Sequence, residues 1–228
     1  GYYGNILMEL ANVREEDLSN NWKKYYKPFR IGKSIIIKPS WEQVTPAEGD
    51  RVLEIDPAST FGTGQHHTTK LVIETLESVI SGGERVLDLG CGSGILSIAA
   101  MLLGADNITM CDIFENAVKT ASENVEKNHI TKDKYHAFIG DITVDSGLRE
   151  RIGGGFDVIC ANIVADVIIA MSGFFNGFLK KDGRLIVSGI IDERLDEVTA
   201  ALLENGFELL NSVDEEGWNC LMLKRMID

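Results

Sequence analysis

The chain has 228 residues, of which 44% are hydrophobic and 25% are charged, and this is enough for one large domain with a full core. The formal net charge of -13 argues against a general nucleic-acid binder, because such proteins contact phosphates through clustered lysine and arginine. No apolar run approaches the ~18 residues of a membrane span, and the first residues do not resemble a secretory leader. We therefore expect a cytoplasmic monomer with no membrane partner and no direct nucleic-acid partner.

The four cysteines are far apart in the sequence, and each lies in or beside an apolar run. This arrangement favours buried thiols in a reducing compartment over disulfides. No CxxC pair occurs, and the four histidines do not combine with the thiols at zinc-ligand spacing, so no metal site is predicted. The cysteines are Cys91, Cys111, Cys160 and Cys220.

The first twenty residues fit no element well. The next segment, 22–38, is rich in lysine, arginine and aromatic residues. It is either a solvated linker whose aromatic side chains dock on the domain or a contact surface for a partner. The stretches "KSIIIKPSW" and "DRVLEIDP" then predict two short strands, and "HHTTKLVIETLESVI" predicts a helix.

From residue 83 onward, short apolar runs alternate with amphipathic ones, which is typical of a parallel sheet covered by helices. Gly104 and Gly206 stand where helices should end. Strands are expected at Arg85–Gly90, Asn107–Ile113, Tyr135–Ile139, Phe156–Asn162 and Arg184–Ser188. Helices are expected at Ile95–Leu103, Glu115–Lys127, Val164–Leu179 and Asp192–Asn205.

The tail, "FELLNSVDEEGWNCLMLKR", predicts two strands joined by a polar turn that contains glycine. Such a hairpin would close one edge of the sheet. The elements together predict an α/β fold with a seven-stranded, mostly parallel sheet and an antiparallel C-terminal hairpin strand.

The stretch "VLDLGCGSGILSIAA" is a glycine-rich turn between a predicted strand and a predicted helix. A dinucleotide fingerprint requires a third glycine where this chain has Ile95, and Asp88 would face a pyrophosphate unfavourably. A carboxylate suits the cationic S-adenosylmethionine instead. We therefore assign Asp88, Gly90, Gly92 and Gly94 to binding that cofactor, the alternative being a tight turn that holds no ligand.

Two further carboxylates follow predicted strands. Asp112 is placed to accept the hydroxyl groups of a ribose, although it could instead cap the helix that begins after Phe114. Ile113, its neighbour, is assigned to the same cofactor site. Asp141 could lie near the adenine amine, and a turn at the end of its strand explains it equally well.

The motif "ANIVAD" follows the fourth predicted strand, at the edge where open α/β sheets bind ligands. Methyl transfer to an amine requires a positioned nucleophile, and carbonyl oxygens can hold its N–H groups. The side-chain oxygen of Asn162 and the backbone oxygen of Ile163 are the candidates for this catalytic role. Asn162 could alternatively be a turn or cap residue.

The stretch "FGTGQHHTT" is a loop that leads into the first long helix. It offers one aromatic and several hydrogen-bonding groups, which suits a lid on the methionine end of the cofactor, while a simple helix-capping loop is the alternative. The candidate residues are Phe61, Thr63, His66 and Thr69.

These motifs, with "DPASTFGTGQHHTT", "CDIFENAV", "SGIIDERLDEV" and "EEGWNCLMLKR", resemble in order the blocks of the ribosomal protein L-eleven methyltransferase family (the PrmA family). The likeness runs from about Trp22 to Arg225. It implies a class I methyltransferase fold, which is Rossmann-like, and S-adenosyl-L-methionine as cofactor. The cofactor contacts that it implies are Thr69, Gly90, Asp112 and Asn162, with Phe61 and Thr63 near the methionine end.

The resemblance also implies the substrate: lysine or N-terminal amines of a large-subunit ribosomal protein. Two departures are visible, because the family usually has proline at the position of His67 and a glycine near Ala58 and Ser59. Family members usually carry an N-terminal recognition domain, and we expect residues 1–20 to be its end or a linker and 21–228 to be the catalytic domain.

Other functions share some of these motifs. A methyltransferase that acts on a small molecule or a nucleic acid would share all of them. An NAD-dependent oxidoreductase would need glycine at Ile95, and a non-catalytic adaptor would bind the cofactor without turnover.

Overall fold

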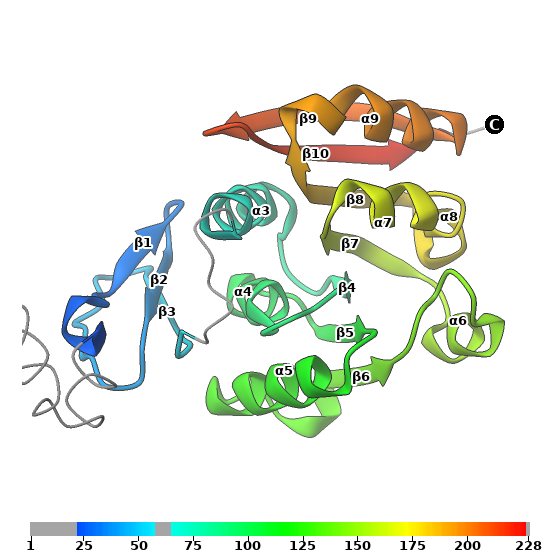
Figure 1. The fold of residues 1–228 in the computed structure, drawn as a ribbon. Helices are drawn as coiled ribbons and strands as arrows, with labels where there is room; N and C mark the ends of the chain where they lie inside the picture. The colour runs from blue at the N-terminus through cyan, green and yellow to red at the C-terminus, as the bar shows by residue number, and fades with distance from the viewer. Residues whose placement is uncertain (1–21, 58–64, 227–228) are drawn as a thin grey trace, which may run out of the picture.

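The computed structural model describes residues 22–57 and 65–226, which form two separate β-sheets (Figure 1). The smaller sheet follows a short 3-10 helix, η1 (Trp22–Tyr25), and contains β1 (Phe29–Ile31), β2 (Ile35–Lys38) and β3 (Arg51–Glu54). β1 runs antiparallel to β2, and β3 runs parallel to β2. The two predicted strands are confirmed, whereas β1 has only three residues and is too short to give a periodic signal.

The basic and aromatic segment 22–38 itself forms η1, β1 and β2. The rings of Tyr26, Phe29 and Trp41 meet edge to face, and the Lys23 ammonium lies 5.2 Å from the centre of the Trp41 ring. Three of its other five cations pair with acidic side chains, in the ion pairs Lys27–Glu42, Arg30–Asp50 and Lys38–Glu54. The alternative of a contact surface for a partner stays a prediction.

The larger sheet has seven strands in the order β6-β5-β4-β7-β8-β10-β9. Five of them are parallel, and the β9–β10 hairpin completes the sheet with antiparallel pairings. The strands are β4 (Arg85–Leu89), β5 (Asn107–Asp112), β6 (Tyr135–Ile139), β7 (Phe156–Asn162), β8 (Leu179–Ile191), β9 (Phe207–Glu215) and β10 (Trp218–Arg225). This confirms the predicted fold, including the hairpin at one edge.

Helices cover both faces of this sheet, so its strands contribute to two buried clusters. In β4, for example, Val86 belongs to one cluster and Leu87 and Leu89 to the other, as the alternation of side chains along a strand requires. The first cluster includes residues of α3 (Gln65–Val79), α4 (Ile95–Leu103) and α5 (Glu115–Lys127). The second includes residues of α6 (Ser146–Ile152), α7 (Ala165–Met171), α8 (Phe175–Phe178) and α9 (Leu195–Glu204).

Three predicted elements differ from the structure. The helix predicted over Val164–Leu179 is divided into α7 and α8, because the chain turns at residues 172–174 around Gly173. β8 extends far beyond the predicted Arg184–Ser188, since an irregular register before Arg184 lets the polar residues 180–183 join the strand. The helix predicted from Asp192 begins as a 3-10 turn, η3 (Asp192–Arg194), and becomes α-helical at Leu195.

Candidate active site

Most of the predicted site residues that the structure describes lie at the carboxyl ends of three neighbouring strands; Asp141 follows β6 and Thr69 lies in α3. The glycine turn follows β4, Asp112 ends β5, and Asn162 ends β7. β4 lies between the other two in the sheet. This edge, where the strand order reverses, is the usual ligand-binding edge of an open parallel sheet.

The three glycines of the turn have positive φ angles, of 73°, 51° and 82°. A Cβ on Gly90 would lie 2.4 Å from Ile163 Cγ2, and one on Gly94 would lie 3.1 Å from the backbone of Ala121 in α5. Gly90 and Gly94 are thus required by packing within the chain. A Cβ on Gly92 would meet nothing within 4 Å, so Gly92 is the glycine that faces open space.

Asp88 lies beneath this turn and is only 1% exposed. Its Oδ2 accepts a hydrogen bond from Ser97 Oγ at 2.8 Å, and its buried Oδ1 has no hydrogen-bond partner in the structure. Burial raises the pKa of Asp88 to about 6, while the hydrogen bonds from Ser97 act in the opposite direction. A buried carboxylate with one unpaired oxygen suits a cationic ligand, which would offset the cost of its burial.

Asp112 makes the contact of a capping residue, and its binding of a ribose stays a prediction. Its Oδ1 accepts a hydrogen bond from Phe114 N at the start of α5, as a capping residue would, and its Oδ2 accepts one from Gly92 N; both distances are 3.0 Å. Each carboxylate oxygen can accept a further bond. Asp112 therefore fixes the glycine turn and keeps the capacity to accept bonds from a ribose.

Ile113 and Asp141 lie near this end of the sheet in different roles. Ile113 is 55% exposed, which leaves an apolar surface beside Asp112. Asp141 Oδ1 accepts hydrogen bonds from Thr143 N and Thr143 Oγ1, and these hold the pKa of Asp141 below its usual value. The turn interpretation of Asp141 thus has a structural basis, and its contact with adenine stays a prediction.

Asn162 and Ile163 place two acceptor oxygens side by side at the end of β7. A Cβ on Gly189 of β8 would lie 2.5 Å from Ile163 O and 3.1 Å from Asn162 Oδ1, so both oxygens approach one point. The amide of Asn162 donates through Nδ2 to Thr68 Oγ1 at 3.2 Å. Sequence reasoning missed Thr68 and Gly189, because only the packing of α3 and β8 brings them to the motif.

The remaining predicted residues are only partly covered by the structure. Thr69 is buried in the first turns of α3, beside Thr68 in the sequence. Phe61 and Thr63 lie outside the described residues, and so does the side chain of His66. The proposed lid therefore stays a prediction.

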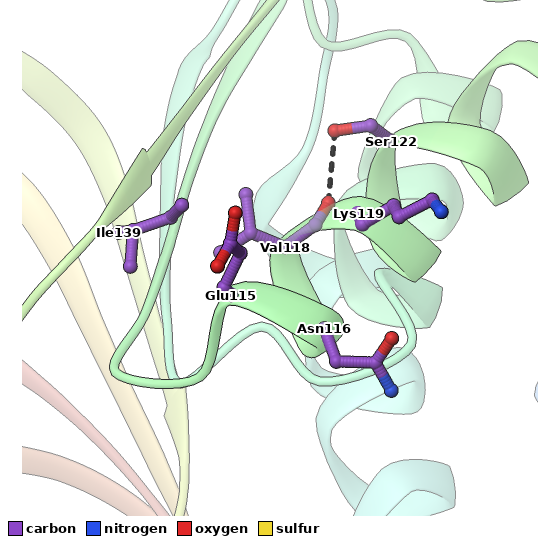
Figure 2. Close-up of a pocket in the computed structure, with 6 residues that line it drawn as sticks. All are labelled: Glu115, Asn116, Val118, Lys119, Ser122 and Ile139. Atoms are coloured by element: carbon purple, nitrogen blue, oxygen red, sulfur yellow. Dashed lines mark hydrogen bonds between the residues drawn. The ribbon is translucent and has the colours of Figure 1, made fainter.

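A groove of about 560 Å³ lies next to this site, between α5 and the end of β6 (Figure 2). Ile139 lines it and pairs in register with Asp112, so the groove begins beside the predicted ribose carboxylate. Its other lining residues all come from α5, and none of the predicted site residues lines it. They are Glu115, Asn116, Val118, Lys119 and Ser122.

Two searches of the described residues bear on other kinds of site. Among residues 22–57 and 65–226, no group of three or more histidine, cysteine or acidic side chains could hold a metal ion. None of the helices in these ranges has the length and apolar character needed to cross a membrane. All four cysteines are free and buried, as the sequence predicts.

Comparison with known proteins identifies the family. Residues 3–226 match the family model described as Ribosomal protein L11 methyltransferase (PrmA). A protein of that name from Caldanaerobacter subterraneus subsp. tengcongensis is 42% identical over 97% of this chain and 69% of its own length. The corresponding protein from Streptococcus pyogenes serotype M3 is 41% identical over 99% of this chain and 69% of its own length.

A crystal structure of a related protein has the same fold. The ribosomal protein L11 methylase from Lactobacillus delbrueckii subsp. bulgaricus superimposes with a TM-score of 0.79 at 29% identity, covering 89% of this chain and all of that one. The class I methyltransferase fold expected from the sequence is thereby confirmed. This chain belongs to the ribosomal protein L11 methyltransferase (PrmA) family.

Proposed function

We propose that this chain transfers methyl groups from S-adenosylmethionine to lysine or N-terminal amines of ribosomal protein L11. One observation carries the proposal: Asn162 Oδ1 and Ile163 O approach the same point at the end of β7, next to the glycine turn. The relatives of this chain are named for the same activity. We propose further that it acts in the cytoplasm and as a monomer.

The residues present fit the proposed cofactor. Asp88 supplies a buried negative charge with an unpaired oxygen, and Gly92 leaves open space where a side chain would otherwise project. Asp112 would accept the ribose hydroxyls with its remaining acceptor capacity. When bound, S-adenosylmethionine supplies an electrophilic methyl group on a positively charged sulfur.

The chain's own contribution to the reaction is the placement of an amine. Asn162 Oδ1 and Ile163 O would accept hydrogen bonds from the two N–H groups of a neutral amine and leave its lone pair directed at the methyl carbon. Neither oxygen is a base, so a lysine must lose its proton before it is held in this way. From a reference pKa of about 10.4, this costs roughly 4–5 kcal/mol at pH 7, and an α-amino group costs much less.

Mass spectrometry of L11 incubated with the enzyme and S-adenosylmethionine tests the activity. We expect methylated amines with the unmutated chain and a single-turnover rate on the order of a hundredfold lower with Asn162→Ala, at nearly unchanged cofactor affinity. Asn211→Ala, on the exposed edge strand β9, is the matched control. If L11 stays unmethylated, the proposed activity is wrong. A normal rate in Asn162→Ala would mean that Asn162 is only a turn residue.

Calorimetry tests the cofactor separately. Asp112→Ala should weaken S-adenosylmethionine binding by roughly ten- to a hundredfold, because hydrogen bonds to a charged acceptor contribute about 1.5–3 kcal/mol. Since Asp112 also holds Gly92 N and Phe114 N, Asp112→Asn is included as a milder variant of the same shape. Tighter binding of NAD than of S-adenosylmethionine by the unmutated chain would favour the oxidoreductase alternative.

A further inference from the structure

Helix α5 reaches the glycine turn through a nearly buried side chain, Asn124, which is 7% exposed. Its Nδ2 donates to the backbone oxygen of Ser93 at 2.8 Å. Ser93 stands between Gly92 and Gly94, and the first acceptor of α4 is Gly94 O, which is bonded to Ile98 N. Asn124 thus supplies a donor to a carbonyl that lies outside the hydrogen-bond ladder of α4.

The C-cap residue of the same helix, Asn128, contacts the small sheet. Its Nδ2 donates to Glu54 O at 2.8 Å and its Oδ1 accepts from Glu54 N at 2.9 Å, so its amide pairs with β3 as a neighbouring strand would. Nδ2 also donates to Asn124 O at 2.8 Å. Residues four apart lie on one helix face, so Asn124 and Asn128 join the glycine turn to β3.

The turn is held from its other end as well. Asp112 Oδ2 accepts from Gly92 N, and Asn124 donates to Ser93 O, so the two-residue segment Gly92–Ser93 is fixed on both sides by β5 and α5. The close approach of Gly94 to Ala121 brings α5 near enough for these contacts. Glycine loses more conformational freedom on ordering than any other residue, so an unsupported turn would lose it during cofactor binding.

We infer that Asn124 and Asn128 are positioning residues of the cofactor site: Asn124 fixes the glycine turn in its binding shape, and Asn128 ties that turn to the small sheet through β3. Neither needs to touch the cofactor, since they act through Ser93 and Glu54. The inference rests on the proposed function, because it takes S-adenosylmethionine as the ligand of the turn. It makes the small sheet part of the cofactor-binding machinery.

Two measurements separate this role from ordinary helix packing. The first is the dissociation constant for S-adenosylmethionine and for S-adenosylhomocysteine by calorimetry. The second is hydrogen exchange of the amides of residues 90–96 without any ligand. Loss of packing alone would lower the melting temperature and leave the affinity of the folded protein unchanged.

We expect Asn124→Ala to weaken the binding of both ligands by about tenfold and to speed amide hydrogen exchange in the turn. Asn124→Asp keeps the shape but removes the donor when ionised, so at pH 8 it should behave as Asn124→Ala does. Asn128→Ala should weaken binding by roughly threefold, and the double variant by less than the product of the two effects, because both act through one turn. Glu123→Ala, exposed on the same helix and outside the groove, is the control and should change neither measurement.

Affinity within twofold of the unmutated chain in Asn124→Ala, with unchanged exchange in the turn, would overturn the inference. If Asn124→Ala does not fold, Asn124→Asp and Asn128→Ala decide the matter, and normal affinity in both overturns it. An unmutated chain that binds neither ligand would instead overturn the proposed function.

Discussion

Thr68 Oγ1 accepts a hydrogen bond from Asn162 Nδ2, at 3.2 Å, and this contact fixes which end of the amide faces Gly189 and Ile163 O, the proposed reaction site. The two ends of an amide have opposite hydrogen-bonding character. With Nδ2 engaged by α3, Oδ1 is turned toward Gly189 and Ile163 O, where an amine would be held. Thr68, which is only 3% exposed, is therefore expected to act on catalysis through Asn162.

Replacing Thr68 with valine keeps the shape of the side chain and removes the hydroxyl. We expect the single-turnover methylation rate to fall at least about tenfold, because the Asn162 amide loses the partner that orients it, while S-adenosylmethionine affinity stays within about twofold. Thr68→Ser should restore most of the rate. Thr199→Val in α9, far along the chain and bonded only within its helix, controls for the substitution itself. Equal losses of rate and affinity would contradict this role.

Gly189 has no room for a side chain. Alanine at this position would be strained at a φ of 84° and would push against Ile163 O and Asn162 Oδ1. We expect Gly189→Ala to lower the methylation rate at least about tenfold by displacing the two acceptors. Gly177→Ala in α8 is the control, since a Cβ there meets nothing within 4 Å. An unchanged rate would show that the two oxygens do not hold the amine.

Asp88 should make the stability of the protein depend on pH. Its pKa in the folded protein is about 6, against an ordinary value of 3.8, so the folded state holds this proton more tightly than the unfolded state does. The contribution of Asp88 to stability is therefore greatest below about pH 4 and is lost as the pH rises through about 6. The difference amounts to on the order of 3 kcal/mol.

Asp88→Asn should consequently raise the free energy of unfolding at pH 8 and have no such effect near pH 4, as measured by urea denaturation at both pH values. The same variant should bind S-adenosylmethionine about tenfold more weakly, because it removes the charge that faces the cation. Asp106→Asn on the surface, where Lys134 holds the pKa of Asp106 below its usual value, should not stabilise the protein at pH 8. If the variant is no more stable than the unmutated chain at pH 8, ionised Asp88 does not destabilise the folded state.

Glu77 of α3 anchors the small sheet. Its carboxylate accepts hydrogen bonds from Lys33 N, Ser34 N and Ser34 Oγ in the turn between β1 and β2. Glu77→Ala should lower the free energy of unfolding by about 1 kcal/mol and speed proteolysis of residues 29–38, because two backbone donors and one hydroxyl group of the turn lose a charged acceptor. Glu74→Ala, one turn earlier on the helix, is the comparison. Equal denaturation midpoints for the two variants would contradict the anchoring role.

Much of the larger sheet could be predicted because its signals are local. The strands at Tyr135–Ile139 and Phe156–Asn162 and the helices at Ile95–Leu103 and Glu115–Lys127 occur at their predicted bounds. These elements have clear apolar periodicity and end at glycine or polar residues. The bulged start of β8 and the division between α7 and α8 depend on packing that is set elsewhere in the chain, so no local pattern reveals them.

In the site, too, local patterns predicted some residues and packing placed the others. The glycine turn, Asp112 and Asn162 could be placed from spacing, because the carboxyl ends of parallel strands meet at one edge. Thr68, Gly189 and Asn124 come from other elements, and only the folded chain brings them to the turn and the motif. The sequence also could not show that Asp112 serves the turn and the helix start at once.

The strand order has a consequence for synthesis of the protein. β10 lies between β8 and β9, although it is translated after both. Until residues 218–225 leave the ribosome, β8 has an open edge and β9 has no strand to pair with. β8 can pair on this side only after translation of β10, so a chain truncated within the hairpin would leave β8 unpaired there and prone to aggregate.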